Sequence, residues 1–487
     1  MSLARSMGRA LAASALVVVS GCGDDDGGPA FVEPGAWITS DRARLRDEAG
    51  RVVVLRGVNA RVEGVFDVSF DDGRLPLEEI PGFSAEDARR MRELGLGVLR
   101  LPINWSGVEP EEGRYDDAYL DRVAEVVATC AAAGVHVLID FHQDAYSKEI
   151  GEDGAPLWAI HPPPTQLLGG PLGDSLTARR ASMQVLEAFD SFFIDDDDDP
   201  TDRRLQAAFA AMAAHVAERF ADEPFVVGYD LFNEPVAADY YLPQFHARVT
   251  DAIRAVDTRH LIFFEPDVSR QFLERAPLAE APFPDPLGVY APHVYTLSFG
   301  DPGNELARVD RARLAPNVEA ASAEAASFGS PLFVGEWGIG PTATRMGDYA
   351  ALTYDLFDEH LASAAAWLWK EDSQGSWGFF DHDGQTWIER DAVRRAHARV
   401  YAERIAGDPV SMRFDASSGT FELRVRGRAE GVPHVVYVPA PPDYAGTFVV
   451  SCDGAPISPA PRRDAATGRI AVVCNGEGEH ALVVTPD

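Results

Sequence analysis

Residues 135–142 read VHVLIDFH, a mostly apolar run that ends in side chains able to do chemistry. A near-continuous apolar run of this length is typical of a parallel strand that is covered on both faces. The segment Tyr119–Ala133 before it has helical character and is followed by Gly134, a residue that often ends helices. The stretch therefore predicts a helix that leads into a buried parallel strand.

The same strand character occurs eight times along the chain. The runs are Val52–Ala60, Val98–Ile103, Val135–His142, Val226–Glu234, Leu261–Pro266, Val289–Tyr295, Pro331–Gly338 and Ala364–Lys370. Further helices are expected from Ser84 onward and at Asp202–Phe220, Leu242–Val256, Asn304–Ser327, Gly347–Leu361 and Arg390–Ile405. Strand alternating with helix in this way predicts an α/β fold, a (β/α)8 or TIM barrel. A doubly wound open sheet is the alternative, but no Gly-x-Gly-x-x-Gly follows the first strand.

The character of the sequence changes near Ile405. Beyond it come short alternating runs separated by Gly, Pro and Asp, with no amphipathic helix. These features predict a small C-terminal β-sandwich. A chain of 487 residues is long enough for a barrel plus such a domain, so we expect the barrel at 37–406 and the sandwich at 407–487.

The N-terminus has the features of an export signal. Arg5 and Arg9 precede the apolar run Ala10–Val19, which is too short to span a bilayer as a mature helix. Ser20-Gly21-Cys22 resembles the bacterial lipoprotein signal, which implies that residues 1–22 carry the signal and that Cys22 is lipidated. An ordinary signal peptide is the alternative. Residues 23–36 then form a flexible acidic tether, and we expect an exported, membrane-anchored or secreted protein.

Charge and cysteine usage exclude several partners and scaffolds. The 43 Lys and Arg face 77 Asp and Glu, a net charge of −34, which argues against nucleic acid or anionic lipid as a partner. In an oxidising compartment Cys452 and Cys474 could form a disulfide, and Cys130 is expected to be a buried thiol. The acidic run Asp195–Asp199 is either a solvated loop or a calcium site. We expect a monomer.

Polar side chains gather where the predicted strands end. Barrel enzymes carry their catalytic groups at this rim. The strand ends include Arg100, Asp140-Phe141-His142-Gln143-Asp144, Asn233-Glu234, Glu265-Pro266-Asp267, His293-Val294-Tyr295, Glu336 and Trp369. No zinc-binding spacing such as His-Glu-x-x-His occurs, so no metal is expected.

Asn233-Glu234-Pro235 and Gly335-Glu336-Trp337 resemble glycoside hydrolase family 5, within a wider clan of retaining barrels. The resemblance covers nearly the whole barrel. It implies that Glu234 is the acid/base and Glu336 the nucleophile, and such enzymes need no cofactor. Glu265 and Asp267 are rival carboxylates at the fifth strand.

The resemblance also implies roles around these two residues. Asn233 would bond the sugar 2-hydroxyl, and Arg100 would lie beneath the nucleophile. His293 and Tyr295 would orient the acid and the nucleophile. Trp369 would be the flat floor for the sugar ring.

Residues 140–147, DFHQDAYS, resemble the endoglycoceramidase group, which cuts between glycan and ceramide. This implies that Asp140, His142 and Asp144 contact the sugar. The long connection Gln143–Thr201 is expected to form an apolar lip for ceramide, or else to pack onto the barrel. Its apolar residues are Ile150, Leu157, Trp158, Ile160, Leu167, Leu168, Phe192, Phe193 and Ile194.

One departure from that group concerns the first strand. Members carry a Lys there, whereas this chain has Arg61, which is not a simple copy of Lys. The expected activity is therefore a retaining β-glycosidase acting on glycosphingolipids. The alternatives are a glucosyl- or galactosylceramidase, a sterol-glucosidase, an endo-β-glucanase or mannanase on polysaccharide, and a non-catalytic glycan-binding protein. The expected partner is a glycolipid or oligosaccharide substrate.

Overall fold

The computed structural model describes residues 35–194, 201–238, 240–272, 279, 281–299, 309–372, 377–427 and 431–487. The predicted signal, Cys22, nearly all of the tether and the run Asp195–Asp199 lie outside these residues. Among the described helices, none has both the length and the apolar character that a bilayer-crossing segment needs.

Eight parallel strands form the barrel, in the order β10-β11-β4-β5-β6-β7-β8-β9. Their bounds are β4 Arg56–Asn59, β5 Val98–Asn104, β6 His136–His142, β7 Val226–Asp230, β8 Leu261–Phe264, β9 Gly288–Tyr290, β10 Phe333–Trp337 and β11 Ser363–Ala366. Parallel bridges join Tyr290 to Leu332 and Val294 to Trp337, between the ends of that order. The predicted TIM barrel is therefore confirmed, and the open-sheet alternative is wrong.

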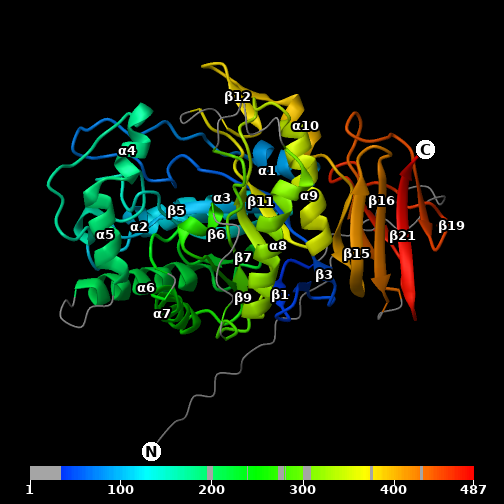
Figure 1. Cartoon of the computed structure of the whole chain (residues 1–487), viewed down its shortest axis with the longest axis horizontal. Helices are drawn as coiled ribbons and strands as arrows, with labels where there is room; N and C mark the ends of the chain where they lie inside the picture. Colours follow the sequence, from blue (N-terminus) through cyan, green and yellow to red (C-terminus); the bar gives the residue numbers. More distant parts are fainter. Residues whose placement is uncertain are drawn as a thin grey trace, which may run out of the picture.

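Helices surround the barrel strands, and α4 lies at their rim (Figure 1). They are α1 Ala85–Glu93, α2 Trp105–Val108, α3 Asp117–Ala132, α4 Leu176–Arg180, α5 Met183–Phe193, α6 Thr201–Phe220, α7 Leu242–Arg254, α8 Arg311–Phe328, α9 Met346–His360 and α10 Asp391–His397. Ser84 opens α1 with a capping box: it accepts from the Asp87 N–H, and Asp87 accepts from the Ser84 N–H. The connection after β6 is not structureless, because α4 and α5 lie in it.

Two antiparallel sheets form the second domain, beside the barrel at the right of Figure 1. The first has the order β1-β2-β3-β14-β17-β20 and the second the order β15-β16-β21-β18-β19. The bounds are β1 Ile38–Ser40, β2 Leu45–Asp47, β3 Val52–Val53, β14 Tyr401–Ile405, β15 Asp408–Asp415, β16 Thr420–Arg426, β17 His434–Tyr437, β18 Phe448–Cys452, β19 Ala455–Pro456, β20 Arg469–Val472 and β21 Glu479–Pro486. One apolar core joins the sheets, so the predicted sandwich is present. The predicted disulfide Cys452–Cys474 is also present, and Cys130 is a buried free thiol.

The predicted domain boundaries differ from the structure in two places. The run Val52–Ala60 is divided: β3 pairs with β14 of the sandwich, and β4 belongs to the barrel. The predicted helix Arg390–Ile405 ends at His397, and residues 401–405 form β14 instead. Pairing with β3 and β17 overrides the helical pattern of this segment. The sandwich therefore takes strands from both sides of the barrel in sequence, and it begins before residue 407.

Candidate active site

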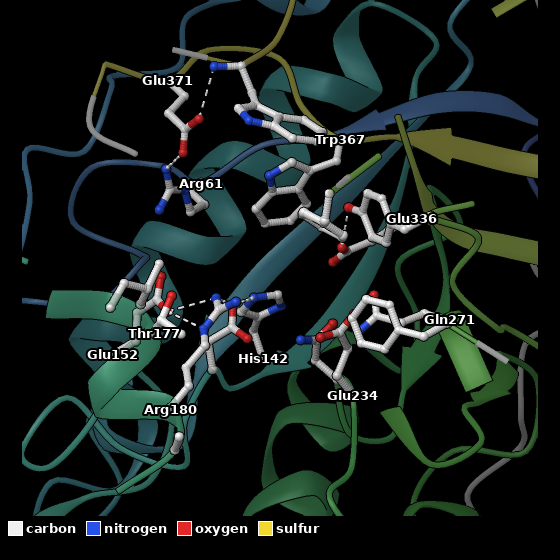
Figure 2. A pocket seen from close by; sticks show the side chains of 18 of the residues that line it. Arg61, His142, Glu152, Thr177, Arg180, Glu234, Gln271, Glu336, Trp367 and Glu371 are labelled. Atoms are coloured by element: carbon white, nitrogen blue, oxygen red, sulfur yellow. Dashed lines mark hydrogen bonds and ion pairs between the residues drawn. The ribbon is translucent and has the colours of Figure 1, made fainter. Parts of the chain in front are cut away.

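A cavity of about 850 Å³ lies at the ends of the barrel strands. Glu234, Glu336, His142 and Trp367 face it from different strands (Figure 2). Opposite Glu234 and Gln271, the wall is charged: Arg61 meets Glu371 there, and Arg180 meets Glu152. Strand ends from around the whole barrel thus converge on one pocket, which is where barrel enzymes carry their chemistry.

The two predicted carboxyl groups are close neighbours. Glu234 follows β7 and Glu336 lies in β10, yet oxygens of the two carboxyl groups and a nitrogen of His293 all lie within 4.8 Å of one another. Retaining glycosidases hold their two carboxyl groups about 5–5.5 Å apart, whereas inverting ones separate them by about 6.5–9.5 Å. The spacing fits the retaining geometry.

Both oxygens of Glu336 accept hydrogen bonds. Arg100 Nη1 donates to Oε1 over 2.9 Å, and the Tyr295 hydroxyl donates to Oε2 over 2.8 Å. Burial raises the pKa of Glu336 and the nearby Glu234 adds to this, while the charges of His293 and Arg100 act in the opposite direction. The predicted positions of Arg100 and Tyr295 are confirmed.

Glu234 is paired with His293, as predicted. Its Oε1 lies 2.8 Å from His293 Nδ1, and His293 Nε2 lies 3.3 Å from Glu265 Oε1. Burial acts against the charged form of His293, but Glu265 and Glu336 outweigh it and raise the pKa of His293 well above its ordinary value. Burial likewise acts to raise the pKa of Glu234, but the bond to His293 lowers it. The proton of the Glu234–His293 pair therefore lies on His293 at neutral pH, opposite an ionised Glu234.

The backbone at Glu234 has a left-handed conformation, with φ of 44°. Such a conformation is uncommon for a residue with a side chain and needs support from its surroundings. Gln143 supplies it: its Nε2 donates to the carbonyls of Asn233 over 2.7 Å and of Glu234 over 3.1 Å. The sequence places Gln143 at the rim but does not predict this role, because only the fold brings the end of β6 beside this turn.

Arg100 lies at the centre of the site and is completely buried. It is 2.9 Å from Asp230, 2.9 Å from Glu265 and 3.0 Å from Asp140, in addition to Glu336. Burial opposes its charge, but these carboxylates raise its pKa well above the ordinary value, so it stays a cation.

Asn233 is held in the same network. Its Oδ1 accepts from Arg100 over 3.0 Å and its Nδ2 donates to the Gln143 carbonyl, and it lines the cavity.

The three residues predicted from the endoglycoceramidase-like stretch divide into two groups. His142 and Asp144 line the cavity. Asp140 does not: it is fully buried beneath His142, and its Oδ2 lies 2.6 Å from His142 Nδ1. The predicted sugar contact by Asp140 is therefore wrong, because its side chain points inward along β6 toward Arg100. Burial alone would lower the pKa of His142, but Asp140, with Asp153 and Asp144, raises it to about 10.

The predicted aromatic floor, Trp369, is also wrong. Trp369 is 1% exposed, packs against Phe379 and Phe380, and donates its Nε1–H to Asp87 over 2.9 Å. Trp367 lines the cavity instead, with its ring nearly parallel to that of His142. Strand β11 ends at Ala366, before both Trp residues. The alternating side-chain directions of a strand therefore do not decide which of the two faces the cavity.

Arg61 lines the cavity but is not available as a free cation. It is fully buried between Glu78 and Glu371, and its Nη2 is 2.6 Å from Glu371 Oε1.

Arg180 of α4 contacts Asp144 at 3.1 Å and Glu152 at 2.8 Å. Burial raises the pKa of Asp144 to about 7, although Arg180 opposes this effect.

Apolar side chains form the remaining rim of the cavity. They come from α4, α5 and the loops after β8, β9 and β11, and Phe272 and Phe299 are 63% and 60% exposed. The lining apolar residues include Leu176, Leu186, Phe272, Phe299 and Trp377.

The predicted lip was placed on the wrong residues of the β6 connection. Ile150, Ile160, Phe192 and Phe193 are buried in the barrel core, so the packing alternative holds for them. Leu157, Leu167 and Ile194 are exposed but do not line the cavity, and Trp158 and Leu168 are half-buried.

Three groups of His, Cys and carboxylate side chains have the spacing of a metal site among the described residues. Two include residues that line the cavity: Glu234, His293 and Glu336, and His142, Asp144 and Asp153. The third includes Cys452, whose sulfur is bonded to Cys474. In the first group, the contacts with Arg100, Tyr295 and His293 already supply partners for the carboxylates.

The chain is similar to endoglycoceramidases in sequence and in fold. It is 28% identical to endoglycoceramidase I of Rhodococcus hoagii, over 91% of this chain and 87% of that one. It is 27% identical to the endoglycoceramidase of Cyanea nozakii, over 70% of this chain and 72% of that one. The solved structure of endo-glycoceramidase II from Rhodococcus sp., captured as a lactosyl-enzyme intermediate, aligns with a TM-score of 0.73 and 26% identity, covering 91% of this chain and all of that one.

Family comparisons match both domains. Residues 83–373, more than half of the chain, match the family Cellulase (glycosyl hydrolase family 5). Residues 399–484 match the glycoside hydrolase family 5 C-terminal domain, which agrees with a sandwich that begins before residue 407. The chain therefore belongs to glycoside hydrolase family 5 and is a glycoside hydrolase.

Proposed function

We propose that this protein is a retaining β-glycosidase that hydrolyses the bond between glycan and ceramide in glycosphingolipids, with Glu336 as nucleophile and Glu234 as acid/base. The observation that carries the proposal is a single cavity with two faces. One wall is charged, through Arg61, Arg180 and their carboxylate partners, and the other rim is apolar, through Phe272 and Phe299. A glycan needs the first surface, and a ceramide chain needs the second.

The first step forms a covalent glycosyl-enzyme. The Glu336 carboxylate attacks the anomeric carbon while the bond from that carbon to the ceramide oxygen breaks. The Glu234–His293 pair gives its proton to the departing oxygen, so ceramide leaves as a neutral alcohol. Arg100 and Tyr295 fix the attacking carboxylate through its two oxygens.

The second step releases the sugar. Glu234 takes a proton from water, the water oxygen attacks the anomeric carbon, and Glu336 leaves as a carboxylate. The configuration at the anomeric carbon is inverted twice and so retained. Asn233, His142 and Asp144 line the cavity where sugar hydroxyls would lie, and Trp367 supplies the flat apolar face beneath the ring.

Substrate profiling tests this proposal. Purified protein lacking residues 1–22 would be incubated with lactosylceramide, glucosylceramide and cello-oligosaccharides in detergent, and the products resolved by mass spectrometry. We expect free lactose and ceramide. Cleavage of glucosylceramide alone would support a glucosylceramidase, and cleavage of the oligosaccharides alone would make the enzyme a polysaccharide hydrolase and refute the ceramide assignment.

We further propose that the mature protein is a monomeric lipoprotein, anchored through Cys22 after removal of the signal. A lipid-linked substrate and a membrane-held enzyme would share one surface. The test is fractionation of cells that express the full chain. Wild type should sediment with membranes, and Cys22→Ala should move to the soluble fraction or remain unprocessed. Equal distribution of the two, with the signal removed to the same extent in both, would refute the anchor.

A further inference from the structure

Gln143 is the first residue after β6, and its side chain reaches the turn that carries Glu234. It is 4% exposed. Its Nε2 donates one hydrogen bond to the Asn233 carbonyl over 2.7 Å and another to the Glu234 carbonyl over 3.1 Å. Its own carbonyl accepts from Asn233 Nδ2 over 3.0 Å. Gln143 is therefore bonded to the Asn233-Glu234 pair through both its side chain and its main chain.

The other end of the Gln143 amide is held by a second turn. Its Oε1 accepts from the Tyr146 N–H over 2.9 Å. A flipped amide would place an N–H against the Tyr146 N–H and an oxygen against the two carbonyls, so this contact fixes the orientation of the amide. Tyr146 is itself anchored, because its hydroxyl donates to the Ala159 carbonyl over 2.8 Å and its ring packs against Phe189. The donor end of the amide is therefore kept on the turn of Glu234.

Both turns that Gln143 joins have left-handed backbone at residues with side chains. The φ angle is 54° at Ala145, 69° at Tyr146 and 44° at Glu234. Such conformations persist only where the surrounding contacts hold them. Close packing holds Gln143 in place as well, since a Cβ added to Gly154 would lie only 2.5 Å from its Cβ. Loss of the amide would therefore free Glu234 to leave its left-handed conformation.

The backbone of Glu234 decides where its carboxyl group points. Its N–H donates to Glu265 Oε2 over 3.0 Å and its carbonyl accepts from Gln143, so the peptide units on both sides of its Cα are fixed. From this backbone the carboxyl group lies 2.8 Å from His293 Nδ1. A rotation of the Glu234 backbone would carry the carboxyl group away from His293 and from the departing oxygen.

We propose that Gln143 is a positioning residue for the acid/base: it holds the Glu234 backbone in the conformation from which the carboxyl group can pass a proton to the departing oxygen. This role rests on the proposed function only in that Glu234 is the acid/base. Gln143 is not one of the described residues that line the catalytic cavity, so it acts through Glu234 rather than on the substrate. Its loss should impair proton transfer and leave the attack by Glu336 intact.

The dependence of the rate on the leaving group tests this role. A phenyl β-lactoside needs an acid to release its phenol, whereas a dinitrophenyl β-lactoside does not. Gln143→Met keeps the length of the side chain but loses the amide, so kcat/KM on the phenyl β-lactoside should fall about 10²-fold. On the dinitrophenyl β-lactoside it should stay within about threefold of wild type. The burst of dinitrophenol counts the folded active sites, so misfolded protein cannot imitate this result.

Two further variants separate positioning from a general loss of structure. In Gln143→Glu the carboxylate keeps the acceptor for the Tyr146 N–H but has no N–H for the two carbonyls, so the same selective loss is expected. Gln206→Met is the matched control, because Gln206 is 5% exposed and donates to the Phe192 carbonyl over 2.7 Å. It should keep the wild-type ratio of the two kcat/KM values even where its stability falls.

The outcomes distinguish this proposal from the proposed function. Equal losses on the two lactosides in both Gln143 variants, or no loss on the phenyl β-lactoside, would overturn the positioning role. Failure of the wild type to cleave lactosylceramide would refute the ceramide assignment, but it would leave the comparison of the two aryl lactosides unchanged.

Discussion

Glu234 and Glu336 are held by different partners, and this difference predicts different outcomes when each is removed. Glu336→Ala should abolish turnover of every substrate, because no group remains to form the covalent intermediate. Glu234→Ala should lower kcat/KM on lactosylceramide by about 10²–10⁴-fold, the usual value of a general acid and base. A dinitrophenyl β-lactoside needs no acid, so Glu234→Ala should still show a rapid burst of dinitrophenol in stopped flow.

Asp267→Asn is the control for these variants. Asp267 is a rim carboxylate that accepts hydrogen bonds from the backbone N–H groups of Ser269 and Ala237. The Asp267→Asn variant should keep kcat within about threefold of wild type. Complete loss of the burst in both Glu234→Ala and Glu336→Ala would contradict the assigned roles.

The proton that His293 holds beside Glu234 predicts the shape of the pH profile. Activity should rise with pH as Glu336 ionises, above the ordinary range of a Glu because burial raises its pKa. It should fall again when the Glu234–His293 pair loses this proton, at a pH set by the raised pKa of His293. In His293→Gln the proton rests on Glu234 alone, so the alkaline limb of kcat/KM should move to lower pH. An unmoved alkaline limb would show that His293 takes no part in holding the proton.

Trp367 and Trp369 lie two residues apart but should respond to mutation in different ways. Trp367→Ala removes the flat face of the cavity and should lower kcat/KM on both lipid and aryl substrates. Trp369→Phe loses the hydrogen bond to Asp87, so it should cost about 1 kcal/mol of stability and leave KM unchanged. Kinetics and urea unfolding of both variants check this, and a KM effect in Trp369→Phe would restore the sequence-based assignment.

At the scale of elements, the apolar rim formed by α5 and the loop after β8 predicts a substrate-specific defect. The double variant Leu186→Ser, Phe272→Ser should lower kcat/KM on lactosylceramide about tenfold or more, because the ceramide chain loses two apolar contacts of about 1 kcal/mol each. An aryl β-lactoside has no such chain, so its kcat/KM should be unchanged. Val410→Ser, an exposed apolar residue of β15, is the matched control. Equal losses on both substrates would mean that the rim supports the fold rather than the lipid.

The elements also show what the sequence can and cannot predict. The barrel strands were predicted because strands buried on both faces are apolar throughout. The two Glu residues were predicted because Asn233-Glu234-Pro235 and Gly335-Glu336-Trp337 stand at strand ends and resemble glycoside hydrolase family 5. Strand β14 was missed because its sequence, YAERI, has no strand alternation of its own. Its partner β3 (Val52–Val53) lies far before it in the chain, on the other side of the barrel sequence, and its partner β17 (His434–Tyr437) lies after it. Trp369 was misplaced because the strand ends at Ala366 and the local path of the chain then decides which Trp faces the cavity. Asp140 was misplaced because it lies within β6, two residues before its end, and is buried beneath His142.

For the whole molecule, the important feature is that the sandwich is assembled from both ends of the barrel sequence. Strands β1–β3 precede the first barrel strand, and β14 follows the last barrel helix. Buried ion pairs cross the seam between the domains, such as that between Arg92 of α1 and Glu403 of β14. The two domains should therefore unfold together rather than as independent units.

Glu403 is the group on which this coupling depends most. It is 2% exposed and binds Arg469 and Arg92. Burial acts against its charge, but Arg469, Arg92 and Arg404 lower its pKa far below the ordinary value. A lowered folded-state pKa contributes stability above the unfolded-state pKa, and this stability is lost as the pH falls through the folded-state pKa.

Glu403→Gln should therefore cost about 3–5 kcal/mol at neutral pH, because it leaves buried guanidinium groups without their carboxylate. The cost should shrink as the pH falls below about 4.5, where an unfolded Glu takes up its proton. Glu422→Gln is the matched control: its pair with Arg424 is exposed to solvent on both sides, so its loss should cost much less than the loss of Glu403. Urea unfolding followed by tryptophan fluorescence and by circular dichroism would measure both variants. A loss in Glu403→Gln no larger than in Glu422→Gln, or a barrel transition that stays at the wild-type midpoint, would show that the two domains are stable independently of each other.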